Sequence, residues 1–208
     1  MNTNINEQGS VLAILRALVP QRTLGYFESL LVAELQANRF LEVFEVAGPR
    51  VPSELVTELP RIEVSYEHDM PVGGSLHWEN GQWVISLRAW ESRTRQRFSL
   101  MHEFKHLLDH PYADRVYRRI DHDTIERVAD HFAACVLMPK RWLKSEWFRS
   151  GQNVSRLAPR LGVSAQALNL RLWHLGLATP TPRCLNEANM TRGGSRHLSV
   201  GTAAKVAA

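Results

Sequence analysis

Residue types that can hold a metal ion and activate water occur together in the pentapeptide His102-Glu103-Phe104-Lys105-His106. This H-E-x-x-H pattern lies within residues 94–109, whose apolar residues recur at helical spacing. Histidines four residues apart lie on one face of a helix, so both imidazoles can point at one ion. Glu103 can lean toward the open side of that ion and act as general base on water there. Without further context, the same pattern also fits an amphipathic helix with two surface histidines.

A third ligand is expected, because a catalytic zinc site usually has three protein ligands and a water. His110 lies about 12 Å along the helix from His102, which is too far to share one ion. Glu126 stands at the start of the next predicted helix and is the better candidate. Asp130 follows it by one turn and can accept the second N–H of a ligand histidine. We therefore predict His102, His106 and Glu126 as metal ligands, with Asp130 behind them.

Three separated segments resemble the ImmA/IrrE family of metallopeptidases. They are Arg97-Phe98-Ser99-Leu100-Met101-His102-Glu103-Phe104-Lys105-His106, Glu126-Arg127-Val128-Ala129-Asp130-His131-Phe132-Ala133-Ala134 and Leu137-Met138-Pro139. In that family an H-E-x-x-H helix precedes an E-x-x-A-N/D-x-F-A segment and a closing L-M-P. Trp78 and Trp83-Val84-Ile85 resemble one branch of it, and the resemblance covers about residues 62–147.

The resemblance implies the same site residues: His102, His106 and Glu126 as zinc ligands and Glu103 as base. Where many members have Asn, this chain has Asp130, which adds a charge. The resemblance also implies a regulatory protease that cuts a helix-turn-helix repressor and so switches on stress, phage or mobile-element genes. Mn²⁺ or Fe²⁺ could occupy the same ligands.

An extended substrate could add to an exposed strand edge near Trp83–Leu87, which makes Trp83, Val84 and Ile85 candidates for substrate binding. The residue that stabilises the oxyanion is left open among Tyr66, Tyr112 and His122.

The elements around the motif predict an α+β fold: a zincin-like domain of helices with a small antiparallel or mixed sheet. We expect helices at residues 10–19, 26–44, 94–109, from 123 or 124 to 137, and 139–151. Alternating residues predict strands at 62–67, 75–78 and 82–87, and Asn80-Gly81 predicts a hairpin turn between the last two.

The domain organisation predicted from these patterns has four parts. They are a flexible N-terminus (1–9), the zincin-like metallopeptidase domain (10–151), a helix-turn-helix-like module (152–178) and a disordered tail (179–208). In the module, Gly162 marks the turn and Ser164 caps the second helix. Pro159 and the lack of a dense basic face argue against DNA binding, so we favour packing or substrate docking over nucleic-acid contact.

Composition and charge fit an ordinary globular protein of 208 residues with no segment apolar enough to span a membrane. Residues 151–208 carry seven Lys and Arg against one acidic residue, which an acidic partner could meet. Cys135 and Cys184 form no recognisable metal or redox pair, and Cys135 lies in an apolar run where a small hydrophobic residue fits. With no export signal and no disulfide framework, we expect a cytoplasmic protein.

Two other functions compete with an active repressor-cleaving protease. In one, the chain is a DNA-binding or protein-interaction regulator whose zincin domain holds metal without catalysis. In the other, H-E-x-x-H serves a hydrolase such as a deformylase. That enzyme would need a cysteine ligand upstream of the motif, and both cysteines lie downstream.

Overall fold

The computed structural model describes residues 11–179. Residues 11–16 are helical, and the following elements are α2 (Tyr26–Val43), η1 (Ser53–Glu58), β1 (Ile62–Glu67), β2 (Gly74–Glu79), β3 (Gln82–Arg88), α3 (Arg93–Asp109), α4 (Ala113–Val116), α5 (His122–Leu137), α6 (Lys140–Arg149), α7 (Val154–Leu161) and α8 (Ala165–His174). The α+β prediction is confirmed. The predicted flexible N-terminus, Cys184 and the predicted tail beyond residue 179 lie outside the described residues.

The sheet has three strands in the order β1-β3-β2, so β3 is central. It runs parallel to β1 and antiparallel to β2, which makes the sheet mixed. The predicted Asn-Gly hairpin is confirmed: Asn80 and Gly81 both have positive φ (49° and 82°) and connect β2 to β3. Positive φ at both central residues is the conformation that suits Asn-Gly in a two-residue hairpin.

The expected substrate edge at Trp83–Leu87 is wrong, because these residues belong to the central strand. Both backbone edges of β3 are used by its neighbours: Ile85 pairs with Val64 of β1 and with Leu76 of β2. Ile85 is fully buried and Val84 is buried. Hydrophobic alternation indicates a strand but carries no information on strand order. Val84 and Ile85 are therefore core residues of the sheet, Trp83 packs partly buried against the core, and the free edges belong to β1 and β2.

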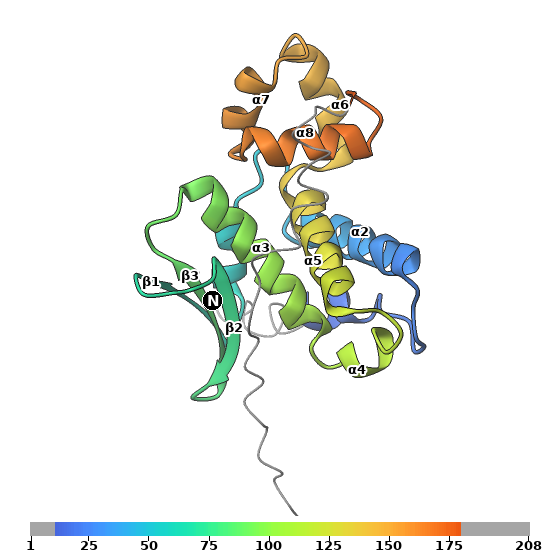
Figure 1. The fold of residues 1–208 in the computed structure, drawn as a ribbon, viewed down its shortest axis with the longest axis vertical. Coiled ribbons are helices and arrows are strands. Elements are labelled where there is room, and N and C mark those ends of the chain that lie inside the picture. Colours follow the sequence, from blue (N-terminus) through green and yellow to red (C-terminus); the bar gives the residue numbers. More distant parts are fainter. Residues whose placement is uncertain (1–10, 180–208) are drawn as a thin grey trace, which may run out of the picture.

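Three helices build the core beside the sheet. Helix α3 packs on β2 and β3, α5 packs on α3, and α2 packs on α5 (Figure 1). One phenylalanine from each of α2, α3 and α5 is fully buried. The Phe104 ring lies 5.7 Å from that of Phe40 and 6.2 Å from that of Phe132 (centroid distances). This aromatic cluster fixes α3 and α5 against each other, which is what a site shared by the two helices requires.

Capping side chains define where α3 and α5 begin. Ser92 accepts a hydrogen bond from the Arg95 N–H at the start of α3. Asp121 accepts one from the Thr124 N–H (2.9 Å), so α5 starts at His122 and not at the expected Asp123 or Thr124. An N-cap residue receives the N–H of the second or third helical residue, and Asp121 is placed to do so.

The C-terminal helices α6, α7 and α8 lie at the end of the molecule away from the β2–β3 hairpin (Figure 1). The two helices and the turn predicted for this module are present: α7 continues through Pro159, Gly162 adopts a left-handed φ of 68°, and the Ser164 side chain caps α8. Arg97 of α3 donates to the Gly162 carbonyl oxygen (3.1 Å) and ties this turn to α3.

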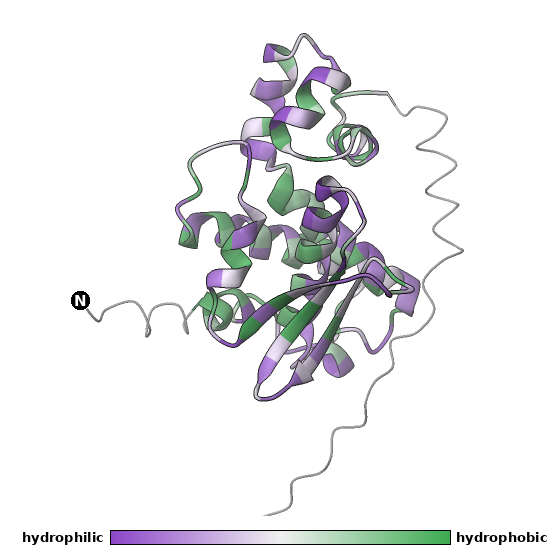
Figure 2. Cartoon of the chain, turned by 90° about the vertical axis from the view of Figure 1, so that its left-hand side faces the viewer, coloured by the Kyte–Doolittle hydropathy of each residue, from purple (hydrophilic) through white to green (hydrophobic). Residues whose placement is uncertain are grey.

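Hydrophilic and hydrophobic residues are interspersed along the strands and helices (Figure 2). Between residues 11 and 179, the helices all lack the combination of length and apolar composition that crossing a bilayer requires.

Candidate metal centre

The two histidines of the H-E-x-x-H pattern come from the middle of α3. Met101, Phe104, Leu107 and Leu108 are buried on the sides of the helix around them, so the orientation of α3 is determined by the core. The His102 and His106 rings lie 4.8 Å apart (centroids), and their Nε2 atoms are 3.1 Å apart. Both imidazole edges therefore converge on one point beside the helix.

The third side chain at this point is Glu126, from the second turn of α5. Its Oε2 lies 3.2 Å from His102 Nε2, and its Oε1 lies 3.3 Å from His106 Nε2. Nitrogen and oxygen ligands at about 2.0–2.1 Å from a tetrahedral ion are about 3.3–3.4 Å apart. The separations in this structure lie close to that value, so the donor set of two imidazoles and one carboxylate fits a zinc ion.

Asp130 lies one turn beyond Glu126 and contacts the other side of the His102 ring. The His102 Nδ1 lies 2.8 Å from Asp130 Oδ1. An N–H on Nδ1 donating to this carboxylate leaves the lone pair of Nε2 directed at the cluster. This contact orients the ring and makes Nε2 a better electron donor.

Glu103 lies in the same cluster but is directed toward the sheet. Its side chain is buried, and burial raises the pKa of its carboxyl group. Gly74 at the start of β2 lies directly against it: a Cβ added to Gly74 would lie only 2.9 Å from Glu103 Oε1. Sequence reasoning missed this contact, although the Gly73-Gly74 pair is a signal that the backbone approaches another group closely.

Carboxylates determine the electrostatics of the cluster. Burial alone would lower the pKa of His102, but the contacts with Asp130 and Glu126 outweigh it and raise that pKa to about 10. Burial would raise the pKa of Glu126, but its contacts with His102 and His106 lower it instead. Three carboxyl groups around two imidazoles thus create a local field that favours a cation.

The remaining sequence candidates are placed differently. His110 packs edge-on against Trp83, with centroids 4.7 Å apart, and is not part of the ligand cluster. Among the oxyanion candidates, His122 lies next to the cluster, with its Nε2 3.7 Å from Glu126 Oε1. Tyr66 is exposed on the edge strand β1, and the Tyr112 ring stacks under the Arg115 guanidinium. Proximity therefore ranks His122 first.

Comparisons with known proteins agree with this architecture. Residues 60–173 match the model of a peptidase family described as the IrrE N-terminal-like domain. No curated protein matches the chain significantly. Among solved structures, the chain resembles a Mycobacterium tuberculosis transcriptional regulator with a TM-score of 0.52 and 16% identity. The match covers 78% of this chain but only 51% of the regulator, and at this identity it shows a shared fold alone.

Proposed function

The chain belongs to the peptidase family of IrrE N-terminal-like domains, and from this premise we propose that it is a zinc-dependent endopeptidase with a regulatory role. The observation that carries the proposal is the convergence of His102, His106 and Glu126 at separations of 3.1, 3.2 and 3.3 Å. A convergence of two imidazoles and a carboxylate from two helices suits zinc, and Mn²⁺ or Fe²⁺ could bind the same donors.

The catalytic roles follow from where each side chain lies. A bound zinc ion would supply a Lewis acid that polarises the scissile carbonyl and lowers the pKa of water. Glu103 takes the proton from the attacking water and returns it to the leaving amine. Asp130 holds the His102 ring in its orientation. His122 stands at the rim of the cluster, where it can donate a hydrogen bond to the developing oxyanion.

The substrate path that we propose runs along β2. Within residues 11–179, β2 pairs with β3 alone, so its other edge is free to add an extended peptide. Of the two edge strands, β2 is the one that packs on α3, and its first residue, Gly74, lies against Glu103. A peptide paired with β2 would run past Glu103, the proposed general base. A peptide could not pair at Trp83–Ile85, the position predicted from the sequence, because both edges of β3 are already paired.

The substrate class that we propose is a helix-turn-helix transcriptional repressor. Two observations support a regulatory substrate: the family match and the fold shared with a protein named as a transcriptional regulator. The chain spans about half the length of that regulator. The structural likeness therefore does not identify the substrate of this chain, and the substrate class is our proposal.

A second function, a regulator that binds DNA or protein and holds metal without catalysis, is favoured by one observation. α7, the left-handed Gly162 and the Ser164-capped α8 form a helix-turn-helix, the geometry that many DNA-binding domains use.

The variant Glu103→Gln separates the two functions. We expect it to lower cleavage of a co-expressed helix-turn-helix repressor by about 10²–10⁴-fold, because it removes the base and no ligand. Metal content should stay at the wild-type level. Glu58→Gln, an exposed carboxylate of η1, serves as the control and should cleave normally. Wild-type cleavage by Glu103→Gln would contradict the peptidase proposal and leave the non-catalytic regulator.

A further inference from the structure

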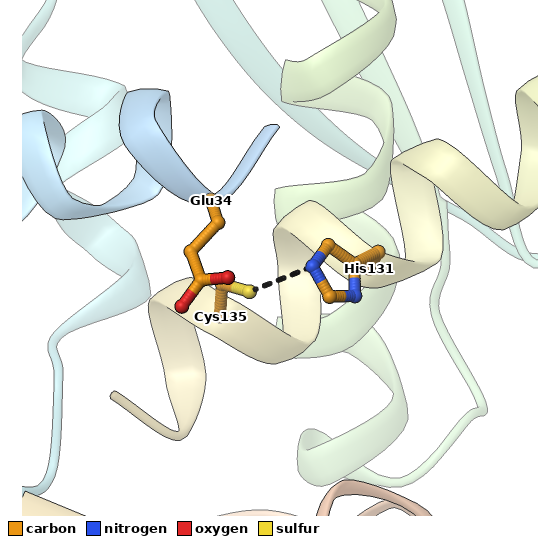
Figure 3. A group of neighbouring side chains, drawn as sticks. All are labelled: Glu34, His131 and Cys135. Atoms are coloured by element: carbon orange, nitrogen blue, oxygen red, sulfur yellow. Dashed lines mark hydrogen bonds between the residues drawn. The ribbon is translucent and has the colours of Figure 1, made fainter. Parts of the chain in front are cut away.

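Helix α5 carries a second pair of metal-binding side chains on a different face from Glu126. His131 and Cys135 are one turn apart and face α2, which contributes Glu34 (Figure 3). One donor atom from each of the three residues lies within 4.8 Å of the others. Sequence reasoning treated Cys135 as a small hydrophobic residue and did not single out its partners, because Glu34 is about a hundred positions away.

The spacing of the two α5 donors fits one particular coordination geometry. The Cys135 Sγ lies 3.5 Å from the His131 Nε2. In a tetrahedral zinc site with Zn–S of about 2.3 Å and Zn–N of about 2.0–2.1 Å, the sulfur and nitrogen are about 3.6 Å apart. The pair is therefore already at the separation that a shared zinc ion requires.

The neutral His131 imidazole and the charges of the donor set also suit a divalent cation. Burial, together with the nearby Arg171 and His174, lowers the pKa of His131 to about 4, so its imidazole is neutral and has a free lone pair. A thiolate and a carboxylate would add two negative charges, which balance one divalent cation. A sulfur donor also favours zinc over Mg²⁺ or Ca²⁺, which prefer oxygen.

The surroundings of Cys135 set the access route and limit the affinity. Cys135 is 2% exposed, whereas His131 and Glu34 are half-buried, so an ion would enter from their side. Burial raises the pKa of the Cys135 thiol to about 11, and Arg171 partly opposes this by favouring the thiolate. The same guanidinium repels a cation, so binding should be weaker than in a site with four protein ligands.

From this geometry we propose that Glu34, His131 and Cys135 form a second zinc site, completed by water, that links α2 to α5. Binding replaces the thiol proton with the metal, and the proton is released to solvent. The site steadies the helix that carries Glu126 from its opposite side. It uses none of the residues of the proposed catalytic centre, so either proposal can fail without the other.

Cobalt(II) substituted into the full-length chain gives the decisive readout. Thiolate ligation produces an intense sulfur-to-cobalt charge-transfer absorption that imidazole and carboxylate ligands do not produce. We expect two cobalt ions per chain and this absorption in the wild type. Cys135→Ser should lose the absorption and one metal equivalent, whereas His102→Ala should lose one equivalent and keep the absorption.

Matched controls keep the result specific. Cys184→Ser should retain the charge-transfer absorption, and Glu42→Gln, an exposed carboxylate of α2, should bind two ions. If Cys135→Ser fails to fold, the less buried variants Glu34→Gln and His131→Gln decide: both should weaken binding of the second ion. A wild type without thiolate absorption, or an absorption that disappears with Cys184 and not with Cys135, would overturn the proposal.

Discussion

Helix α3 carries two polar pairs with the same i, i+4 spacing but opposite surroundings. His102 and His106 keep 15% and 18% of their side-chain surface exposed and meet Glu126 from another helix. Lys105 and Asp109 are 2% and 8% exposed, and the lysine Nζ lies 2.5 Å from an aspartate oxygen.

The two pairs differ in how their charges are satisfied. The Lys105 ammonium is matched by the Asp109 carboxylate, which also accepts a hydrogen bond from the Tyr117 hydroxyl. That network is complete within the protein. The histidine pair instead faces an excess of carboxylates and remains accessible from solvent, which is the environment in which we propose that a cation binds. Identical spacing thus produces a structural ion pair on one side of α3 and a candidate metal centre on another.

The largest expected effect comes from removing a metal ligand. His106→Ala should abolish peptidase activity and lower the metal content by one equivalent, because two donors hold the ion too weakly. Metal analysis of the purified chain and a repressor-cleavage assay measure this. His110→Ala, on the same helix but outside the cluster, should behave as wild type; unchanged metal content in His106→Ala would refute the ligand assignment.

Breaking the ion pair between Lys105 and Asp109 should lower the stability of the fold. Asp109→Ala should lower the free energy of unfolding by about 3–5 kcal/mol, because it leaves the Lys105 charge buried and unpaired. Urea unfolding measures this loss. The double variant Lys105→Met, Asp109→Leu removes both charges and should recover most of it. A single variant that loses less than about 1 kcal/mol would mean that the pair is solvated and is not a structural contact.

An intermediate effect, on metal affinity, is expected from removing Asp130, which contacts His102. Asp130→Ala should weaken metal affinity by about 10–100-fold, because the His102 ring loses the acceptor that orients it. Asp130→Asn keeps an acceptor oxygen and should recover part of the affinity. Metal titration with a competing chelator measures both, with Asp114→Ala on α4 as the control. Equal affinity in Asp130→Ala and wild type would show that the ring is held by packing alone.

The smallest expected effect tests the contact between β2 and Glu103, the proposed general base. In Gly74→Ala the new methyl group displaces the Glu103 carboxylate, so cleavage should fall about tenfold, less than the 100-fold that a 1 Å misplacement can cost. Metal content should not change. Gly73→Ala, whose Cβ would lie 3.4 Å from the Glu91 carboxylate oxygens, is the matched control. Equal cleavage by both variants would mean that Glu103 tolerates the displacement.

Much of this protein follows from local patterns in its sequence. The Asn80-Gly81 turn, the strands before and after it and the helix around His102 were all predicted, because each depends on residues a few positions apart. The prediction that Glu126 converges with the two histidines has a similar basis, since both helices are strongly patterned and only the short α4 separates them in the chain.

The tertiary structure determined the features that depend on residues far apart in the sequence. Strand order placed Trp83–Ile85 in the centre of the sheet and left β2 as the edge beside Glu103, and packing of α2 on α5 brought Glu34 to His131 and Cys135. Periodicity reports which face of an element is buried, but it does not report which other element covers that face. The proposed ligand residues could therefore be read from the chain, whereas the proposed substrate edge and the second donor cluster required the packed fold.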